Sequence, residues 1–170
     1  MIFYLFSLGG IIFLLILLSM VWPPDSPWAP WWRTSKKTAR KMCEIAGIKK
    51  GDIVYDLGSG EGTALFVAAK EFKAVGFGVE IDPIRFIYSK LLLKINGLSS
   101  QVKIKRANLF KEDFSKADVV FVYLVPKTLN KLLPKFKKLK KGSKIISYRY
   151  EINLPLYRYD KEENIRIYII

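Results

Sequence analysis

The chain of 170 residues has no histidine and a single cysteine, Cys43. These absences exclude a histidine-based catalytic triad, a metal site built from Cys and His, and a disulfide within one chain. Cys43 lies in a helical pattern, which favours a small buried residue over a nucleophile. Acidic residues are also scarce, since 15 Asp and Glu stand against 29 Lys and Arg, a net charge of +14. The basic residues are spread along the chain, which argues against a nucleic-acid partner and suits a solvated surface or anionic lipid.

No charged side chain occurs in residues 1–22, which are almost wholly apolar. A helix needs ~20 residues to span a bilayer, so we expect a single transmembrane anchor that contacts the lipid. A cleaved signal peptide is disfavoured, because no basic residue precedes the apolar run and residues 21–24 form a poor cleavage site. Basic residues at 33–41 then favour a single-pass membrane protein whose globular part lies on the cytoplasmic, or equivalent inner, side.

Tryptophan and proline crowd the segment at 23–34, which follows the predicted anchor. Prolines stop a helix and stiffen a connector, and tryptophans favour the membrane interface. We therefore divide the chain into an anchor at 1–22, an interfacial connector at 23–34 and a globular domain at 35–170. Whether Trp31, Trp32 or residues 33–40 close over a ligand stays open at this stage.

Apolar strands alternate with amphipathic helices through the rest of the chain. This rhythm predicts an α/β, Rossmann-like, doubly wound domain with a mainly parallel sheet. The helices are expected at 35–47, 61–71, 82–96 and 128–139, and the parallel strands at 53–57, 74–80, 102–107, 118–124 and 143–148. Two short strands, at 156–159 and 165–169, suit an antiparallel end of the sheet.

The most informative motif is the loop at 54–62, Val-Tyr-Asp-Leu-Gly-Ser-Gly-Glu-Gly. Gly58, Gly60 and Gly62 lie between an apolar strand and a helix, and glycine has no Cβ to obstruct a ligand. Open α/β sheets bind ligands at such junctions, and an acid at the end of the second strand, here Glu80, holds the hydroxyls of a ribose. The loop and the acid together predict a nucleoside cofactor site.

With these features the domain resembles class I S-adenosylmethionine-dependent methyltransferases, which have a seven-stranded sheet. The resemblance covers about residues 35–170 and rests on the segments 56–62, 76–83 and 108–110. More narrowly, the chain is similar to small membrane-anchored lysine methyltransferases related to those that modify the c-ring protein of ATP synthase and the adenine nucleotide translocase. The predicted anchor and the Val-Tyr-Leu-Val-Pro run at 122–126 support this narrower resemblance.

The resemblance implies a binding site for S-adenosyl-L-methionine and no metal. The implied cofactor-binding residues belong to the glycine loop and to the ends of the next two strands: Asp56, Gly58, Ser59, Gly60, Glu61, Gly62, Glu80, Ile81, Asn108 and Leu109. By this resemblance Glu80 binds the ribose, Asp56 orients the loop or binds the cofactor's ammonium, and Asn108 with Leu109 flanks the adenine. The family favours an acid at the position of Asn108 and Asp at that of Glu61, and the first departure weakens the expected adenine recognition.

The resemblance also implies that Tyr123 and Pro126 lie where the acceptor meets the methyl group. Methyl transfer to a lysine needs alignment of the reacting atoms and loss of the amine's proton, which burial favours by lowering the lysine pKa. No histidine is needed for that chemistry. A membrane-associated protein is the expected substrate, because an enzyme of +14 is repelled by most basic surfaces, whereas an anchor confines both partners to one membrane.

Two other interpretations remain open. The first is a methyltransferase for a lipid or a small lipophilic molecule, which an anchor would serve equally well. The second is a different class, a non-catalytic or nicotinamide-binding membrane module. The dinucleotide fingerprint is Gly-x-Gly-x-x-Gly. This chain has Gly58-x-Gly60-x-Gly62 instead, which favours the methyltransferase.

Overall fold

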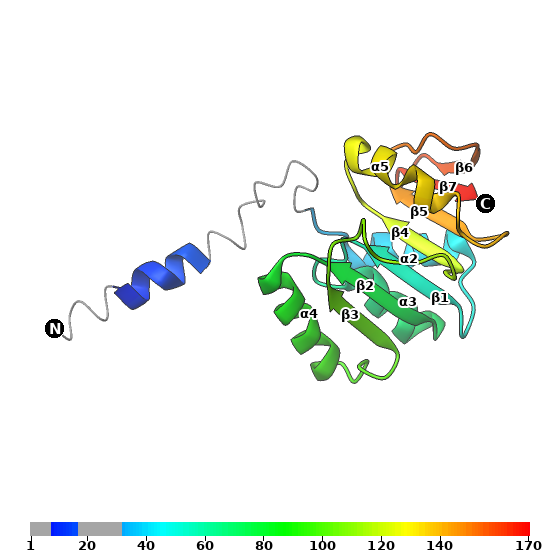
Figure 1. Ribbon diagram of the computed structural model, residues 1–170. Helices are drawn as coiled ribbons and strands as arrows, with labels where there is room; N and C mark the ends of the chain where they lie inside the picture. Colours follow the sequence, from blue (N-terminus) through cyan, green and yellow to red (C-terminus); the bar gives the residue numbers. More distant parts are fainter. Residues whose placement is uncertain (1–7, 17–31) are drawn as a thin grey trace.

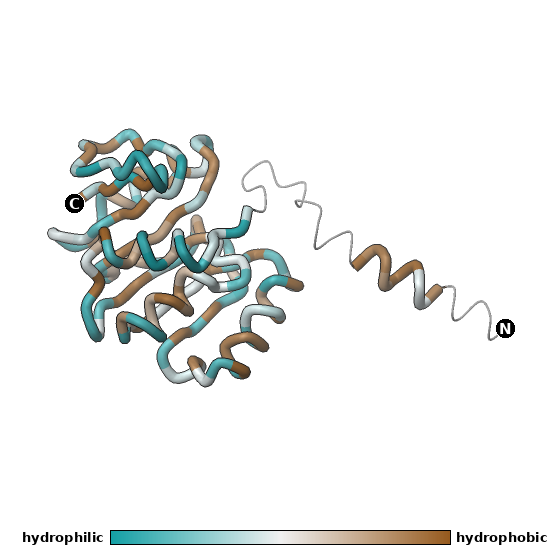
Figure 2. The backbone as a smooth tube through the Cα atoms, turned by 180° about the vertical axis from the view of Figure 1, so that it is seen from behind, coloured by the Kyte–Doolittle hydropathy of each residue, from teal (hydrophilic) through white to brown (hydrophobic). Residues whose placement is uncertain are grey.

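The computed structural model describes residues 8–16 and 32–170, so most of the predicted anchor and residues 23–31 of the predicted connector lie outside the described residues. Residues 8–16 form an α-helix with a hydrophobic course, as Figure 2 shows. Within the two described ranges, no helix has both the length and the hydropathy needed to cross a membrane.

Seven strands form one mixed sheet, as the sequence predicts (Figure 1). Their spatial order is β3-β2-β1-β4-β5-β7-β6, and all neighbouring pairs up to β5 are parallel. The last two strands pair antiparallel, also as predicted. The strands are β1 (Ile53–Leu57), β2 (Val75–Glu80), β3 (Val102–Arg106), β4 (Val119–Val122), β5 (Lys144–Tyr148), β6 (Leu156–Asp160) and β7 (Ile165–Ile169).

Four helices connect or precede these strands: α2 (Lys36–Ala46), α3 (Thr63–Phe72), α4 (Pro83–Ile95) and α5 (Pro126–Phe136). Local chemistry explains most of their ends. The Ser35 hydroxyl caps α2, and Asp82 caps α4 immediately before a proline at its first position. Two predicted helix starts were wrong. The helix expected at 61 begins at Thr63, because Gly62 has a left-handed backbone with φ of 83°. The helix expected at 128 begins at Pro126, which suits a first helical turn.

The core lies on both faces of the sheet. Helices α2, α3 and α4 bury apolar residues against one face, and Cys43 is fully buried there, as expected. Helix α5 and the segment at 107–117 cover part of the other face, where the Phe114 and Phe136 rings meet. The sheet is therefore a rigid platform, and the loops after β1, β2 and β4 share its carboxyl edge.

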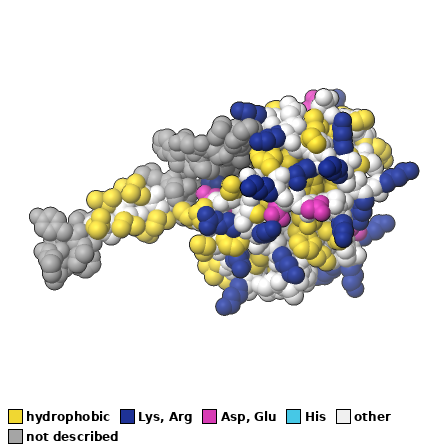
Figure 3. All heavy atoms as spheres, viewed as in Figure 1, with side chains coloured by type: hydrophobic (Ala, Val, Ile, Leu, Met, Phe, Trp, Pro, Cys, Tyr) yellow, Lys and Arg dark blue, Asp and Glu magenta, His cyan; other side chains and the backbone are white. Residues whose placement is uncertain are grey.

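Basic residues after the connector are largely held by carboxylates of the domain. Ion pairs join Lys37 to Glu163 at 3.1 Å and Arg40 to Glu71 at 2.6 Å. A longer contact of 3.8 Å joins Lys41 to Asp160. These pairs tie α2 to α3 and to the end of the chain. The positive surface that Figure 3 shows is made by other Lys and Arg side chains of the domain as well.

Candidate active site

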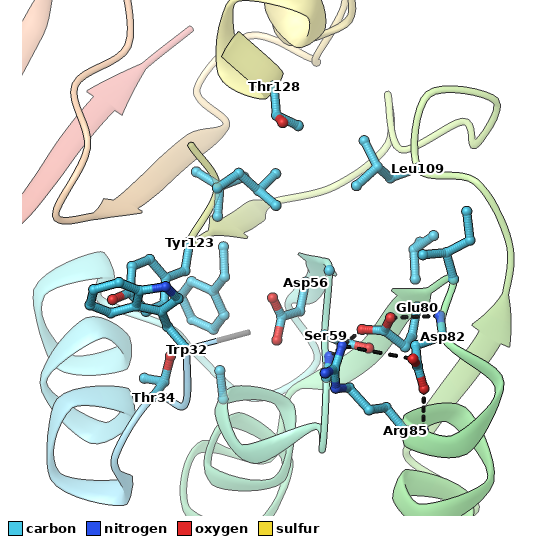
Figure 4. A pocket seen from close by; sticks show the side chains of 18 of the residues that line it. Trp32, Thr34, Asp56, Ser59, Glu80, Asp82, Arg85, Leu109, Tyr123 and Thr128 are labelled. Carbon is cyan, nitrogen blue, oxygen red and sulfur yellow. Dashed lines mark hydrogen bonds and ion pairs between the residues drawn. The ribbon is translucent and has the colours of Figure 1, made fainter. Parts of the chain in front are cut away.

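A cavity of about 410 Å³ opens at the carboxyl ends of β1, β2 and β4. The strand order reverses between β1 and β4, the position at which open α/β sheets bind ligands. The volume lies within the ~300–1,000 Å³ typical of small-molecule sites. Figure 4 shows Asp56 between the Trp32 and Tyr123 rings on one side and Ser59 and Glu80 on the other.

Ten of the twelve residues predicted for the site line this one cavity. They are Asp56, Gly58, Ser59, Gly60, Glu61, Glu80, Ile81, Asn108, Leu109 and Tyr123. Gly62 and Pro126 are not among the lining residues. Gly62 instead caps α3, where a Cβ would meet the Phe66 ring at 2.8 Å. Pro126 is the first residue of α5, so it shapes the backbone that follows Tyr123.

The glycine loop is fixed from below and open toward the cavity. The Gly58 and Ser59 N–H groups both donate to the Val79 carbonyl, at 2.9 and 3.0 Å. Gly60 has φ of 53°, and no atom lies within 4 Å of where its Cβ would be. The loop therefore presents bare backbone at Gly60, with room for a ligand against it.

Glu80 is almost fully buried, at 6% exposure, and organises the loop. Its carboxylate accepts a hydrogen bond from the Gly60 N–H at 2.7 Å and another from the Asp82 N–H at 2.9 Å. Each carboxylate oxygen has a second lone pair for a ligand hydroxyl. Sequence reasoning expected Glu80 to bind a ribose and did not foresee that the same side chain holds Gly60 in position.

The Ser59 hydroxyl is a buried polar group without a partner among the residues that the structure describes. It lies over Gly78, where a Cβ would come within 2.7 Å of Ser59 Oγ. Such groups are rare in native proteins, because each one costs free energy when it is left unsatisfied. A polar ligand in the cavity explains the unsatisfied hydroxyl.

Asp56 has the most unusual electrostatics in the cavity. Burial raises the pKa of its carboxyl to about 7, and the charge of nearby Glu80 adds to the effect. A perturbed carboxyl in a cleft is typical of functional sites. A positively charged ligand group would favour the ionised form and bind to it.

The adenine-flanking pair lies on the opposite wall. The Asn108 carboxamide oxygen accepts the Phe110 N–H at 2.9 Å, so its amide nitrogen is the part left to face a ligand. Leu109 supplies an apolar surface beside it, and the Lys131 ammonium lies 4.5 Å from the Phe110 ring centre. This arrangement is compatible with the predicted role of Asn108 and Leu109.

Several lining residues were not predicted from the sequence. Arg33 forms an ion pair with Glu61 at 2.6 Å and brings Trp32 to the cavity, which answers the question left open for that residue. Trp31 lies outside the described residues. Arg85 also lines the cavity, and its place in the first turn after Glu80 was a usable signal. Thr128 gave no such signal, because α5 starts earlier than expected.

Tyr123 follows β4 at the mouth of the cavity, within a group of aromatic rings. Its ring packs edge-on against Tyr148 at 4.6 Å and against Trp32 at 6.3 Å. Burial raises the pKa of the Tyr123 phenol to about 12, although the charge of Arg149 opposes that shift. Tyr123 therefore stays protonated at neutral pH, as a hydrogen-bond donor and an aromatic surface and not as a base.

Comparison with known proteins places these features in a family. A family model described as the ANTKMT methyltransferase domain matches residues 56–155. The protein-lysine N-methyltransferase of Saccharolobus islandicus (strain REY15A) is 39% identical over 137 residues, which cover 78% of this chain and 82% of that protein. The lysine N-methyltransferase of Caenorhabditis elegans that is named for the C component of ATP synthase is 29% identical over 107 residues, which cover 61% of this chain and 54% of that protein.

A solved structure agrees with the fold. It is the RNA methyltransferase from Salinibacter ruber in complex with S-adenosyl-L-homocysteine. It matches this chain with a TM-score of 0.76 and 32% identity, and the match covers 81% of this chain and 91% of that one.

Proposed function

The chain belongs to the ANTKMT methyltransferase family, and we propose that it transfers the methyl group of S-adenosyl-L-methionine to lysine side chains of a membrane-associated protein. The observation that carries the proposal is the cavity with Glu80 and the bare backbone of Gly60 on one side and the Tyr123 ring on the other. A nucleoside cofactor and an apolar acceptor channel need these two chemistries in one place.

The residues present fit this cofactor. Glu80 and the unsatisfied Ser59 hydroxyl offer hydrogen bonds to polar groups, and the ionised form of Asp56 suits an ammonium. Asn108 and Leu109 offer an amide and an apolar surface to a base. When bound, S-adenosylmethionine supplies an electrophilic methyl group on a positively charged sulfur.

Lysine as the acceptor is supported by the relatives and by the chemistry of the cavity mouth. Two relatives are named lysine methyltransferases, one of them over 82% of its length. A lysine amine has a pKa of ~10.4 in water and must lose its proton to attack. The buried Tyr123 ring provides an apolar surface, and desolvation against such a surface lowers the amine's pKa.

Association with a membrane is supported by two apolar surfaces. Residues 8–16 form a helix with exposed apolar side chains inside the uncharged stretch 1–22. Along α4, Ile87, Leu91 and Ile95 recur at helical spacing and are 53–69% exposed, with two lysines on the same helix. We propose a single-pass anchor at 1–22 and a catalytic domain on the cytoplasmic or equivalent inner side, where anionic lipids attract a basic protein.

RNA is a second candidate acceptor, because the similar structure from Salinibacter ruber is named an RNA methyltransferase and this chain is strongly basic. The loop after β4 argues against it. Nucleic-acid methyltransferases commonly carry Asn/Asp-Pro-Pro-aromatic at this place, whereas this chain has Tyr123-Leu124-Val125-Pro126.

One labelling experiment separates the candidates. The full chain is incubated with S-adenosylmethionine carrying a radioactive methyl group and with membranes of its source cells. The products are then treated with protease or ribonuclease, or extracted into organic solvent. We expect label that protease releases and that ribonuclease and solvent do not. Label in RNA or in lipid would replace the proposal with the corresponding alternative.

A further inference from the structure

Four aromatic side chains, Trp32, Tyr123, Tyr148 and Tyr150, gather around one guanidinium at the mouth of the cavity; we call them the aromatic cluster. The Arg149 Cζ lies 5.0 Å from the Trp32 ring centre, 5.4 Å from that of Tyr148 and 5.7 Å from that of Tyr123. Tyr150 adds its ring 6.2 Å from Tyr123. Each of the three distances to the cation lies within the ~6 Å of a cation–π contact.

The cluster borders the proposed site of chemistry. Trp32 and Tyr123 line the cavity, and Figure 4 shows their rings beside Asp56. Tyr148 is the last residue of β5, which pairs with β4 and so ends at the same edge of the sheet. The cation therefore lies against two rings that also face the cavity.

The backbone of Arg149 is fixed, whereas its side chain is exposed. Its φ of 67° is left-handed, a conformation that is uncommon for a residue other than glycine. The Arg149 N–H donates to the Asn164 carbonyl at 2.8 Å, and its carbonyl accepts from Arg166 Nη1 at 2.8 Å. These bonds direct the side chain toward the aromatic cluster without fixing its guanidinium.

The guanidinium is bound chiefly by rings. A hydrogen bond to Tyr148 raises the pKa of Arg149. Within residues 8–16 and 32–170, none of the salt bridges involves Arg149. A site that binds a cation through aromatic faces can exchange one organic cation for another, and methylated ammonium groups are well suited to such faces.

We propose that the aromatic cluster binds the ammonium group of the target lysine and of its methylated product, and that Arg149 occupies this place until the lysine displaces its guanidinium. The inference rests on the proposed function. A neutral amine gains positive charge as its nitrogen bonds to carbon, so rings at this point favour the charged transition state and product over the neutral amine. Added methyl groups enlarge the apolar surface that meets the rings.

The test uses tetramethylammonium as the probe and the full chain as the protein. The indole N–H signal of Trp32, assigned with Trp32→Phe, reports binding by NMR in the presence of matched sodium chloride. We expect Arg149→Ala to bind the probe about five- to tenfold more tightly than the wild type, because a cation–π competitor is gone. Arg149→Gly suits the left-handed backbone and should behave alike if the alanine variant folds poorly.

Control variants make the result specific. Arg158→Ala removes the same charge from β6, outside the aromatic cluster, and should leave probe binding unchanged. Tyr148→Leu combined with Arg149→Gly should abolish the tighter binding. Equal or weaker binding in both Arg149 variants, or tight binding that survives Tyr148→Leu, would overturn the inference.

Cofactor binding by the same samples separates this inference from the proposed function. S-adenosylmethionine binding without probe binding would refute the aromatic cluster as a cation site and leave the methyltransferase intact. Probe binding without S-adenosylmethionine binding would refute the proposed function and leave a cation site of unassigned purpose.

Discussion

The substitution Asp56→Asn should stabilise the protein at high pH and weaken cofactor binding. The Asp56 carboxyl has a pKa of about 7 in the folded chain against an ordinary value of 3.8. A raised pKa means that stability is fully present below pH ~4 and is lost as pH rises through 7, because the folded state resists ionisation. Asparagine cannot ionise and escapes that loss.

The magnitude follows from the shift. About three pKa units, at ~1.36 kcal/mol each, make Asp56→Asn more stable by about 4 kcal/mol at pH 8. At pH 5 the folded carboxyl is protonated and the unfolded one is largely ionised, so the advantage falls to about 2 kcal/mol. Urea unfolding of the full chain and the variant at both pH values measures the two differences.

Asp118→Asn is the matched control with the opposite sign. Burial alone would raise the pKa of Asp118, but the Lys140 ammonium and the Ile53 N–H outweigh burial and lower it. A lowered pKa gives stability that is present at neutral pH and lost in acid, so this variant should be destabilised at pH 8. A stability difference for Asp56→Asn that is the same at pH 5 and 8, or a loss at pH 8, would refute the electrostatic reasoning.

Three further outcomes are expected. Gly60→Ala should abolish S-adenosylmethionine binding in calorimetry while the fold survives, because its Cβ enters open cavity space; Gly97→Ala, with a similar φ of 66° and open surroundings away from the cavity, should bind normally, and equal loss in both would point to backbone strain instead. Glu80→Gln should lower the unfolding free energy less than Glu80→Ala, which leaves the Gly60 and Asp82 N–H groups without their acceptor at about 1–3 kcal/mol each, and equal losses in denaturant melts would contradict this. Cys43 should resist iodoacetamide at pH 8 in the folded protein and react in urea, because burial raises the pKa of its thiol to about 12; rapid alkylation of the native chain would show that the thiol is accessible.

The sequence was most informative where local chemistry determines structure. The glycine loop, the cap at Asp82 and the acid at the end of β2 follow from residue types at short spacing, and the structure brings them to one cavity. The antiparallel end of the sheet was also predictable, because the chain after β5 has no room for another full helix.

Features that depend on distant contacts were not predictable. The cluster around Arg149 joins Trp32 to rings more than ninety residues away, and only the sheet topology brings them together. The raised pKa of Asp56 needs both burial and Glu80, from different strands. The start of α5 was missed because Pro126 is favourable at a first helical turn as well as in a loop.

The most direct test of the central claim is the identity of the methylated atom. Membranes are incubated with the full chain and with S-adenosylmethionine bearing a deuterated methyl group, and the digested proteins are sequenced by tandem mass spectrometry. The account predicts deuterated methyl groups on lysine side-chain nitrogens with the wild type and none with Gly60→Ala. Heavy methyl groups on another side chain, or an unlabelled proteome beside labelled RNA or lipid, would contradict it.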